Sequence, residues 1–339
     1  MDKRTKRKDE HIQLALDHPS VSQSDFDSIK LIHKSLPQCD VKDINLETQI
    51  QGIKLTTPIY INAMTGGSMR AGEINNKLAI VARETNTAIA VGSTHAALKD
   101  NTLAQTYAIV REIYKGPLFS NVGADVSTEF AKRAVDLLQA DALQIHVNAP
   151  QELVMPEGNR TFSRWLENIE AIVTSIGVPV IVKEVGFGMS HETMLTLKAA
   201  GVKTIDVSGS GGTNFIYIEN ERRTMKEFDY LKDWGQSTAI SLIESQNTAL
   251  ETLASGGIRN PLDILKCLVL GAQAVGLSRP ILLKLQESGI EATIEYIDYL
   301  NEQLILLSTM VGKTSIQDLK SVQYVLQKDV WAWYQQRKG

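Results

Sequence analysis

Alternating polar residues in the middle of the chain are the sharpest candidates for chemistry. In the segment 142–148, Gln144, His146 and Asn148 occupy every second position, with apolar residues between them. Because side chains alternate across a strand, these three polar groups would share one face. A lone histidine would more often be a hydrogen-bonded core residue, but three polar groups facing inward need many partners. The pattern therefore favours a ligand site.

An amide and a carboxylate, Gln151 and Glu152, follow this strand on the next loop. A carboxylate beside a phosphate site commonly holds Mg²⁺, because this ion keeps its waters and takes one or two carboxylates plus phosphate oxygens. Without a phosphate nearby, Glu152 would be an ordinary surface residue. Its interpretation as a metal ligand therefore depends on a phosphate site elsewhere in the sequence.

Two glycine-rich turns supply such a site. The segment 255–259 reads Ser-Gly-Gly-Ile-Arg and ends at an Asn-Pro pair, which is typical of a helix cap and first helical position. The segment 276–280 reads Gly-Leu-Ser-Arg-Pro. Free backbone N–H groups and the positive end of a helix dipole bind anions. Tight turns alone would explain the glycines, but not Arg259 and Arg279 arriving at the same place.

Lys183 ends another apolar run, flanked by Val182 and Val185. Burying an ammonium group is costly unless a negative group pairs with it. Such a lysine can form a Schiff base. It can also pair with an anionic flavin ring, whose reduced form gathers charge near N1. The residues alone leave both alternatives open.

Short β-rich runs that alternate with helical patterns must position these groups. Eight runs are expected to be strands, at 58–64, 88–93, 118–123, 142–148, 179–185, 204–208, 252–256 and 274–278. Apolar residues at helical spacing lie between them, for example at Ile74, Leu78, Val81 and Ala82. This alternation predicts an α/β fold, a single (β/α)₈ TIM barrel over 58–312, with its active site at the C-terminal ends of the strands. A doubly wound open sheet is the alternative.

Two segments lie outside the predicted barrel. Residues 1–57 are expected to form an N-terminal arm, and residues 313–339 a C-terminal helical tail. Within the barrel, the segment 209–236 is longer than an ordinary βα loop. Its charged stretch 219–223 would usually be solvated, but a loop of this length over the catalytic face is also typical of a lid.

Composition excludes several classes of function. The chain has 339 residues, 43% hydrophobic and 22% charged, which is enough apolar side chain for one large core. Its net charge of -4 and its pI near 5.9 argue against broad nucleic-acid binding. No apolar run approaches the ~18 residues of a membrane span. The two cysteines lack metal or redox spacing, and the charged N-terminus has no apolar signal region, so we expect a cytoplasmic protein.

Taken together, these segments resemble the type 2, FMN-dependent isopentenyl-diphosphate isomerases. The likeness covers nearly the whole chain. Its most specific parts are Arg-Lys-Asp-Glu-His-Ile at 7–12 and Gln-Ile-His-Val-Asn-Ala-Pro-Gln-Glu at 144–152. Further matching stretches lie at 63–67, 91–93, 121–123, 182–186, 207–214 and 255–259.

The resemblance implies FMN as cofactor, NAD(P)H as its reductant and Mg²⁺ as the metal. It implies that the flavin is held by Ala63, Met64, Thr65, Ser93, Asn121, Lys183, Ser208 and Thr213. It places the flavin phosphate on Gly256, Gly257, Ile258, Arg259, Ser278 and Arg279. It implies that isopentenyl or dimethylallyl diphosphate is bound by Arg7, Lys8, Ser93, His95, His146, Asn148 and Gln151, with Mg²⁺ on Glu152. The implied assembly is a homotetramer or homo-octamer, with no nucleic acid or membrane as partner.

One departure from the family pattern concerns His95. The family often has Ser-Gln-Arg after the second strand, where this chain has Ser93, Thr94 and His95. A fixed guanidinium is thereby replaced by a titratable and weaker partner for a diphosphate.

The implied reaction moves a double bond between the two diphosphates without net oxidation, so the flavin must be reduced but is not consumed. Protonating an unactivated alkene creates tertiary-cation character, which an electron-rich flavin can stabilise while its N5 or N1 edge shuttles protons. In this hypothesis the flavin is the main acid–base group, and His146 and Gln151 position the substrate. Arg7 and Lys8 would close over the diphosphate and exclude water.

Two other functions fit parts of the sequence. An FMN oxidoreductase of the 2-hydroxy-acid oxidase type shares the barrel and the phosphate turn. Such enzymes carry a catalytic histidine and a nearby arginine just before the turn of strand seven, whereas the segment 245–254 contains no histidine. The second alternative is a non-catalytic barrel that binds phosphate or nucleic acid through the basic arm. Surface binding, however, does not need an interior set of polar residues.

Overall fold

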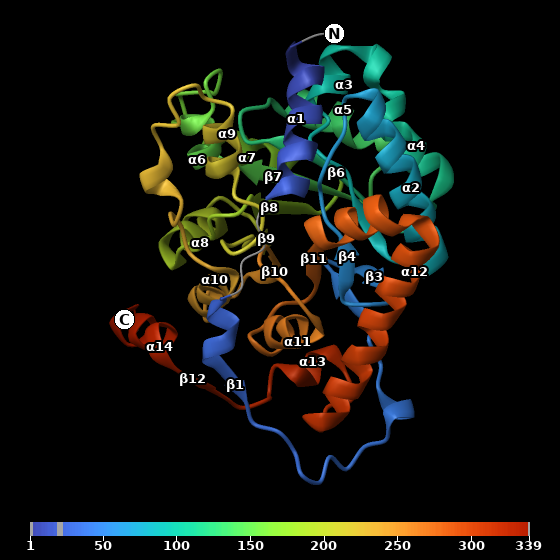
Figure 1. Cartoon of the computed structure of the whole chain (residues 1–339), viewed down its shortest axis with the longest axis vertical. Helices are drawn as coiled ribbons and strands as arrows, with labels where there is room; N and C mark the ends of the chain where they lie inside the picture. Colours follow the sequence, from blue (N-terminus) through green and yellow to red (C-terminus); the bar gives the residue numbers. More distant parts are fainter. Residues whose placement is uncertain (1–2, 19–22, 338–339) are drawn as a thin grey trace.

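Eight parallel strands close into a barrel at the centre of the molecule (Figure 1). The computed structural model describes residues 3–18 and 23–337. In chain order the barrel strands are β4 (Ile59–Ile61), β5 (Ala88–Ala90), β6 (Leu118–Gly123), β7 (Ala142–Val147), β8 (Val180–Glu184), β9 (Thr204–Asp206), β10 (Glu251–Ser255) and β11 (Val275–Leu277). The last strand pairs with the first, which closes the barrel. The predicted (β/α)₈ barrel is therefore confirmed, and the open-sheet alternative is wrong.

Helices cover the outside of the barrel because each presents apolar side chains to the strands. They are α2 (Met69–Thr85), α4 (Gln105–Ile113), α5 (Thr128–Leu138), α7 (Trp165–Ser175), α8 (His191–Ala199), α10 (Thr238–Ser245), α11 (Pro261–Val269) and α12 (Arg279–Met310). The predicted stripe on α2, from Ile74 to Ala82, is buried. Helix α11 begins as predicted, because the Asn260 side chain accepts the backbone N–H of Asp263 and Pro261 takes the first helical position.

Three short helices follow the carboxyl ends of barrel strands and bring extra side chains to that end. They are α3 (His95–Lys99) after β5, α6 (Ala149–Val154) after β7 and α9 (Phe215–Glu221) after β9. Helices α6 and α9 pack against each other. The C-terminal end of the barrel is therefore more heavily built than a minimal strand–helix repeat requires.

A hairpin closes the opposite end of the barrel. Strands β2 (Thr48–Ile50) and β3 (Ile53–Leu55) pair antiparallel across a turn at Gln51 and Gly52. Ile50 and Leu55 join the apolar cluster inside the barrel, with Tyr60, Phe119 and Leu253 among its members. Residues 48–55 of the predicted arm are therefore part of the barrel core.

The rest of the arm runs from one end of the molecule to the other. Helix α1 (Lys3–Asp17) packs against α2, α9 and α12 (Figure 1). Short 3₁₀ helices η1 (Asp25–Ser28) and η2 (Val41–Asp43) follow, with β1 (Ile29–Leu31) between them. The predicted helical tail contains α13 (Ile316–Leu319) and α14 (Lys328–Arg337), and also a strand, β12 (Tyr324–Leu326), which pairs antiparallel with β1. The arm and the tail are thus joined by main-chain hydrogen bonds.

None of the helices in the described ranges, 3–18 and 23–337, combines the length and apolar composition needed to cross a bilayer.

Candidate active site

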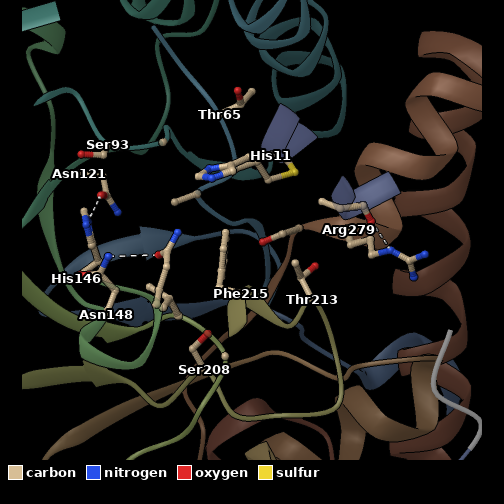
Figure 2. A pocket seen from close by; sticks show the side chains of 18 of the residues that line it. His11, Thr65, Ser93, Asn121, His146, Asn148, Ser208, Thr213, Phe215 and Arg279 are labelled. Carbon is tan, nitrogen blue, oxygen red and sulfur yellow. Dashed lines mark hydrogen bonds between the residues drawn. The ribbon is translucent and has the colours of Figure 1, made fainter. Parts of the chain in front are cut away.

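A cavity of about 1340 Å³ opens at the carboxyl ends of the barrel strands. Figure 2 shows part of its wall, with His146, Asn121 and Ser93 on one side and Arg279 on the other. Every candidate site residue predicted from the sequence lines this cavity: Arg7, Lys8, Ala63, Met64, Thr65, Ser93, His95, Asn121, His146, Asn148, Gln151, Glu152, Lys183, Ser208, Thr213, Gly256, Gly257, Ile258, Arg259, Ser278 and Arg279. The barrel thus brings together residues from all eight strand ends and from the arm.

His146 enters this cavity as an uncharged ring. Its Nδ1 lies 2.8 Å from Oδ1 of Asn121 on the neighbouring strand (Figure 2). Burial, reinforced by the charges of Lys8, Lys183 and His95, lowers the pKa of His146 to about 3, against a smaller opposing effect of a backbone carbonyl. The ring is therefore neutral near pH 7. With Nδ1 engaged by Asn121, the ring has Nε2 left for the cavity and carries no positive charge.

Lys183 has the negative partner that its burial requires. Its Nζ lies 3.6 Å from Oδ2 of the fully buried Asp206. The same ammonium donates to the Ser208 hydroxyl at 3.0 Å and to the Glu184 backbone carbonyl at 2.8 Å. A lysine held in an ion pair is not the free amine that Schiff-base chemistry needs. This arrangement favours the alternative in which Lys183 contributes a fixed charge.

Helix α1 carries further cations to the cavity. Arg7 and Lys8 both line it. The helix is attached to α2 and α9 by polar contacts, because Ser68 donates to Asp9 at 2.6 Å and Arg222 donates to Glu10 at 3.2 Å. Burial and the neighbouring Arg7 charge lower the pKa of Lys8 to about 8, although the Glu219 charge opposes them.

Glu219 organises a buried polar cluster beneath α1. This fully buried carboxylate accepts a hydrogen bond from Gln151 Nε2 at 2.9 Å and pairs with Arg222 Nη1 at 2.5 Å and His11 Nε2 at 3.0 Å. Burial alone would raise the pKa of Glu219, but these bonds outweigh it and lower that pKa to about 2. The Gln151 oxygen faces the other way and accepts from Asn148 at 3.1 Å.

This cluster corrects one expectation. Glu219 and Arg222 belong to the charged stretch 219–223, for which a solvated surface was one alternative. Both side chains are instead packed under the arm, because Arg222 forms ion pairs with Glu10 of α1 and with Glu157, and Glu219 contacts His11 of α1. The excursion 209–236 therefore helps to cover the cavity, as the lid alternative requires.

Glu152 lies at the edge of the cavity, and both of its carboxylate oxygens accept hydrogen bonds. Its Oε1 accepts from Asn148 Nδ2 at 3.1 Å, and its Oε2 accepts the backbone N–H of Asn159 at 2.6 Å. In the part of the chain that the structure describes, no group of three His, Cys, Asp or Glu side chains forms a closed metal site. A single carboxylate at a cavity edge suits Mg²⁺, which completes its shell with water and phosphate oxygens.

The glycine turn after β10 forms a close-fitting backbone cradle. Gly256 and Gly257 have φ of 86° and 69°, a region that favours glycine. A Cβ on Gly256 would lie 2.2 Å from the Gly209 carbonyl oxygen, and one on Gly212 would lie 2.7 Å from the Gly257 nitrogen. Helix α12 begins beside this turn, at Arg279. The pattern fits the anion site predicted from the sequence.

The two arginines of these turns, Arg259 and Arg279, have protein partners in this structure. The Arg259 guanidinium binds Asp27 at 2.7 Å and Asp263 at 2.8 Å. Arg279 donates to Ala15 O at 2.7 Å and to two further carbonyl oxygens at the end of α1. Carboxylates and helix C-terminal carbonyls compete with a phosphate for these cations. Both side chains line the cavity but have protein partners in this structure, so their contact with a flavin phosphate stays a prediction.

The hydroxyl of Thr65 is buried in the cavity wall. Its Oγ1 has no hydrogen-bond partner among the residues that the structure describes. The backbone beside it is tightly packed, because a Cβ on Gly92 would lie 2.7 Å from the Thr65 nitrogen. A buried hydroxyl without a partner is uncommon and indicates a site that a bound group completes.

His95 lies at the start of α3, with its ring 5.1 Å from that of Phe130. It lines the cavity and is close enough to His146 to lower the pKa of that ring. Its contact with a diphosphate stays a prediction.

The sequence reasoning missed several residues that complete the site. His11 belongs to the Arg-Lys-Asp-Glu-His segment at 7–11, which the sequence already singles out. Glu219 belongs to the charged stretch 219–223, whose composition by itself indicates only a polar surface. Asp206 lies between two apolar residues, in Ile-Asp-Val at 205–207. A single acidic residue in an apolar strand is the sequence feature that indicates a buried partner for Lys183.

Comparison with known proteins identifies the family. A family model described as FMN-dependent dehydrogenase matches residues 130–326, more than half of the chain. Isopentenyl-diphosphate delta-isomerase of Staphylococcus saprophyticus is 53% identical over 338 residues, which cover 99% of this chain and 97% of that protein. The proteins of the same name from Staphylococcus haemolyticus and Staphylococcus aureus are 52% and 51% identical over 337 residues. This chain belongs to the isopentenyl-diphosphate delta-isomerase family.

Solved structures confirm the fold of this family member. A mandelate oxidase variant with (S)-mandelic acid matches with a TM-score of 0.67 at 18% identity, covering 95% of this chain and 97% of that one. Mandelate oxidase with (S)-2-phenylpropionate matches with a TM-score of 0.66, also at 18% identity. At this level of identity the likeness concerns the barrel alone. This chain and the oxidases thus share a scaffold.

Proposed function

We propose that this protein interconverts isopentenyl and dimethylallyl diphosphate with the help of reduced FMN and Mg²⁺. The observation that supports this most strongly is the convergence of all predicted flavin, diphosphate and metal positions on one cavity. The relatives carry the name of this activity at 51% to 53% identity over nearly the whole chain. The 2-hydroxy-acid oxidase alternative is supported by the FMN-dependent dehydrogenase model and by the shared scaffold, but the oxidases are only 18% identical to this chain.

The residues present fit FMN. The glycine cradle after β10 would hold its phosphate by backbone N–H groups, next to the N-terminus of α12. Thr65, whose buried hydroxyl lacks a partner, and Lys183 would face its ring. When bound and reduced by NAD(P)H, FMN would supply an electron-rich ring with exchangeable protons.

At the diphosphate end, the chain supplies charge from two directions. Arg7 and Lys8 come from α1, and Glu152 would hold Mg²⁺ from the loop after β7. A metal ion and basic side chains together would neutralise the negative charge of a bound diphosphate. Because α1 packs over the cavity between α9 and α12, the same residues that bind the diphosphate would also exclude water.

At the alkene end, the chain supplies orientation. The Gln151 amide is held at both ends, by Glu219 and by Asn148, so it presents a fixed edge to the cavity. The neutral His146 ring is held through Asn121. Side chains fixed in this way position a small apolar group without needing to move during the reaction.

The redox state of the flavin tests this function. Purified protein with FMN and Mg²⁺ should show no isomerase activity under air, and should become active when the flavin is reduced anaerobically by NAD(P)H or dithionite. The product should be measured together with the remaining reductant, because an isomerisation consumes none. One reductant oxidised per product formed would show a different reaction and contradict the proposal.

The pKa of Lys8 gives a prediction on pH. With a pKa of about 8 in the free protein, Lys8 is charged below that pH and loses its proton above it. Because kcat/KM reports ionisations of the free enzyme, kcat/KM should fall as pH rises through about 8. A Lys8→Arg variant keeps its charge and should lack this alkaline fall, which stopped-flow or endpoint assays across pH 6 to 10 would show.

Arg7→Ala serves as the matched control on the same helix. It should lower kcat/KM by roughly tenfold to a hundredfold, as expected for one charge-assisted bond, while the flavin spectrum stays unchanged. The alkaline fall should remain, since Lys8 is still present. An identical alkaline fall in Lys8→Arg would assign it to another group.

A further inference from the structure

Three buried amides connect His146 to Asp206 across the floor of the barrel. His146 Nδ1 lies 2.8 Å from Asn121 Oδ1, and Asn121 Nδ2 donates to Gln144 Oε1 at 3.1 Å. Gln144 Nε2 donates to Asn62 Oδ1 at 3.2 Å, and Asn62 Nδ2 donates to Asp206 Oδ2 at 3.0 Å. We call Asn121, Gln144 and Asn62 the amide chain. All three are at most 3% exposed, so water does not substitute for these bonds.

The far end of the amide chain has a fixed orientation. The carboxylate of Asp206 can only accept, and it already accepts from the hydroxyls of Tyr60 at 2.8 Å and Ser255 at 2.7 Å. The backbone N–H of Ala63 can only donate, and it donates to Asn62 Oδ1 at 2.8 Å. One acceptor-only group and one donor-only group therefore hold the Asn62 amide with its NH₂ toward Asp206 and its oxygen toward Gln144.

This orientation passes along the amide chain. Since the Asn62 oxygen faces Gln144, Gln144 must turn its NH₂ toward it, which leaves the Gln144 oxygen for Asn121. Asn121 must then turn its NH₂ toward Gln144, which leaves its own oxygen for His146. A neutral imidazole that faces an oxygen carries its proton on the nitrogen nearest to it. The direction of four hydrogen bonds is thus set by groups on the far side of the barrel.

We propose that Gln144 is a positioning residue that sets the tautomer of His146. In this tautomer Nδ1 carries the proton and Nε2 keeps its lone pair. Gln144 does not line the cavity, and it acts only through Asn121. The effect of this tautomer on activity rests on the proposed function, because His146 lines the cavity that would hold the alkene end of the substrate.

The tautomer decides what His146 can do. An unprotonated Nε2 accepts a hydrogen bond or takes up a proton from a donor in the cavity, while Nδ1–H stays bonded to Asn121. The opposite tautomer would offer a donor at Nε2 and would set Nδ1 against the Asn121 oxygen, two acceptors 2.8 Å apart. Turning Asn121 would relieve that conflict, but it would bring the Asn121 and Gln144 oxygens together.

The test compares two substitutions of the same residue. Gln144→Met removes both ends of the amide, so Asn121 is free to turn and His146 should lose its single tautomer. Gln144→Glu keeps an oxygen toward Asn121 whether or not the new carboxyl is ionised, so Asn121 and the tautomer should stay as they are. The readout is the pair of imidazole ¹⁵N resonances of His146 in FMN-loaded protein labelled with ¹⁵N-histidine, assigned with a His146→Asn sample.

The expected result is a protonated Nδ1 and an unprotonated Nε2 in the wild type and in Gln144→Glu, and an averaged or Nε2-protonated ring in Gln144→Met. An unchanged ring in Gln144→Met would overturn the proposal, because another acceptor, such as the Val122 carbonyl that acts on this ring, would then set the tautomer. A wild-type ring that carries its proton on Nε2 would also overturn the proposal.

Kinetics give a second readout. Supporting hydrogen bonds of this kind change activity by about ten- to a hundredfold, so Gln144→Met should lose that much kcat with FMN still bound and with KM nearly unchanged. The ¹⁵N measurement needs no turnover. A wild type with the expected tautomer but no isomerase activity would therefore contradict the proposed function and leave the role of Gln144 standing.

Discussion

Replacing Glu152 by Gln should lower isomerase kcat/KM by roughly a hundredfold or more at limiting Mg²⁺, a larger loss than the ten- to hundredfold typical of residues that only support a metal ligand. Glu152 is the carboxylate at the cavity edge next to Gln151 and Asn148, and Mg²⁺ in such sites depends on one or two carboxylates. FMN should remain bound, because its predicted phosphate cradle lies after β10. Activity measured against Mg²⁺ concentration, with the flavin absorbance as reference, checks both parts.

Two further variants distinguish a loss of Mg²⁺ binding from a disturbance of the loop. In Glu152→Gln the new amide would face two donors, Asn148 Nδ2 and the Asn159 N–H, and so would disturb the loop. Glu152→Asp keeps the charge and should recover activity at high Mg²⁺. Glu157→Gln, on the same loop, should have little effect on the Mg²⁺ requirement, because that carboxylate pairs with Arg222 and Arg7; any change in KM through Arg7 should not depend on Mg²⁺. If Glu157→Gln reproduces the Mg²⁺ defect of Glu152→Gln, the metal ligand is assigned wrongly.

Lys183→Met should make the bound flavin harder to reduce. Lys183 lines the cavity, and in the proposed function its ammonium would face the flavin ring and stabilise the negative charge that reduction places there. Loss of a charge-assisted bond of about 1.5–3 kcal/mol corresponds to a potential lower by about 30–65 mV for a two-electron couple. Dye-linked titration of the flavin gives this value directly, and FMN should also dissociate more readily from the variant.

Asp206→Asn should shift the flavin reduction potential in the opposite direction. Asp206 lies 3.6 Å from the Lys183 ammonium and partly neutralises it. Removing its charge should therefore raise the flavin potential. The double variant removes both charges of a buried pair, which avoids an unpaired carboxylate and should return the potential toward that of the wild type. A potential that falls in both single variants would indicate general disturbance of the site, and the fixed-charge role of Lys183 would be wrong.

The fold was predictable because its signals are local. Strand runs such as 142–148 and helix starts such as Asn260-Pro261 depend on neighbours in the chain, and eight repeats of the same alternation leave few architectures. The same holds for the glycine turn, since Gly256 and Gly257 have the positive φ angles that a tight turn of glycines allows.

The parts of the site that depend on distant packing were not predictable. Glu219 is buried because α1, some 200 residues earlier in the chain, lies over it, and a local pattern of charges cannot show this. Arg259 and Arg279 arrive at the predicted place, but Asp27 and the end of α1 compete for their guanidinium groups. Sequence placed these residues correctly and could not choose among their partners.

The N-terminal segment limits how this protein can be truncated or combined with its relatives. The chain that carries Lys8 over the cavity continues into the hairpin β2–β3, whose Ile50 and Leu55 are at most 4% exposed inside the other end of the barrel. A protein that starts at residue 58 would therefore have an apolar opening at its base as well as an uncovered cavity. Chimaeras between relatives should exchange the first 57 residues together with the barrel, because neither part is an independent module.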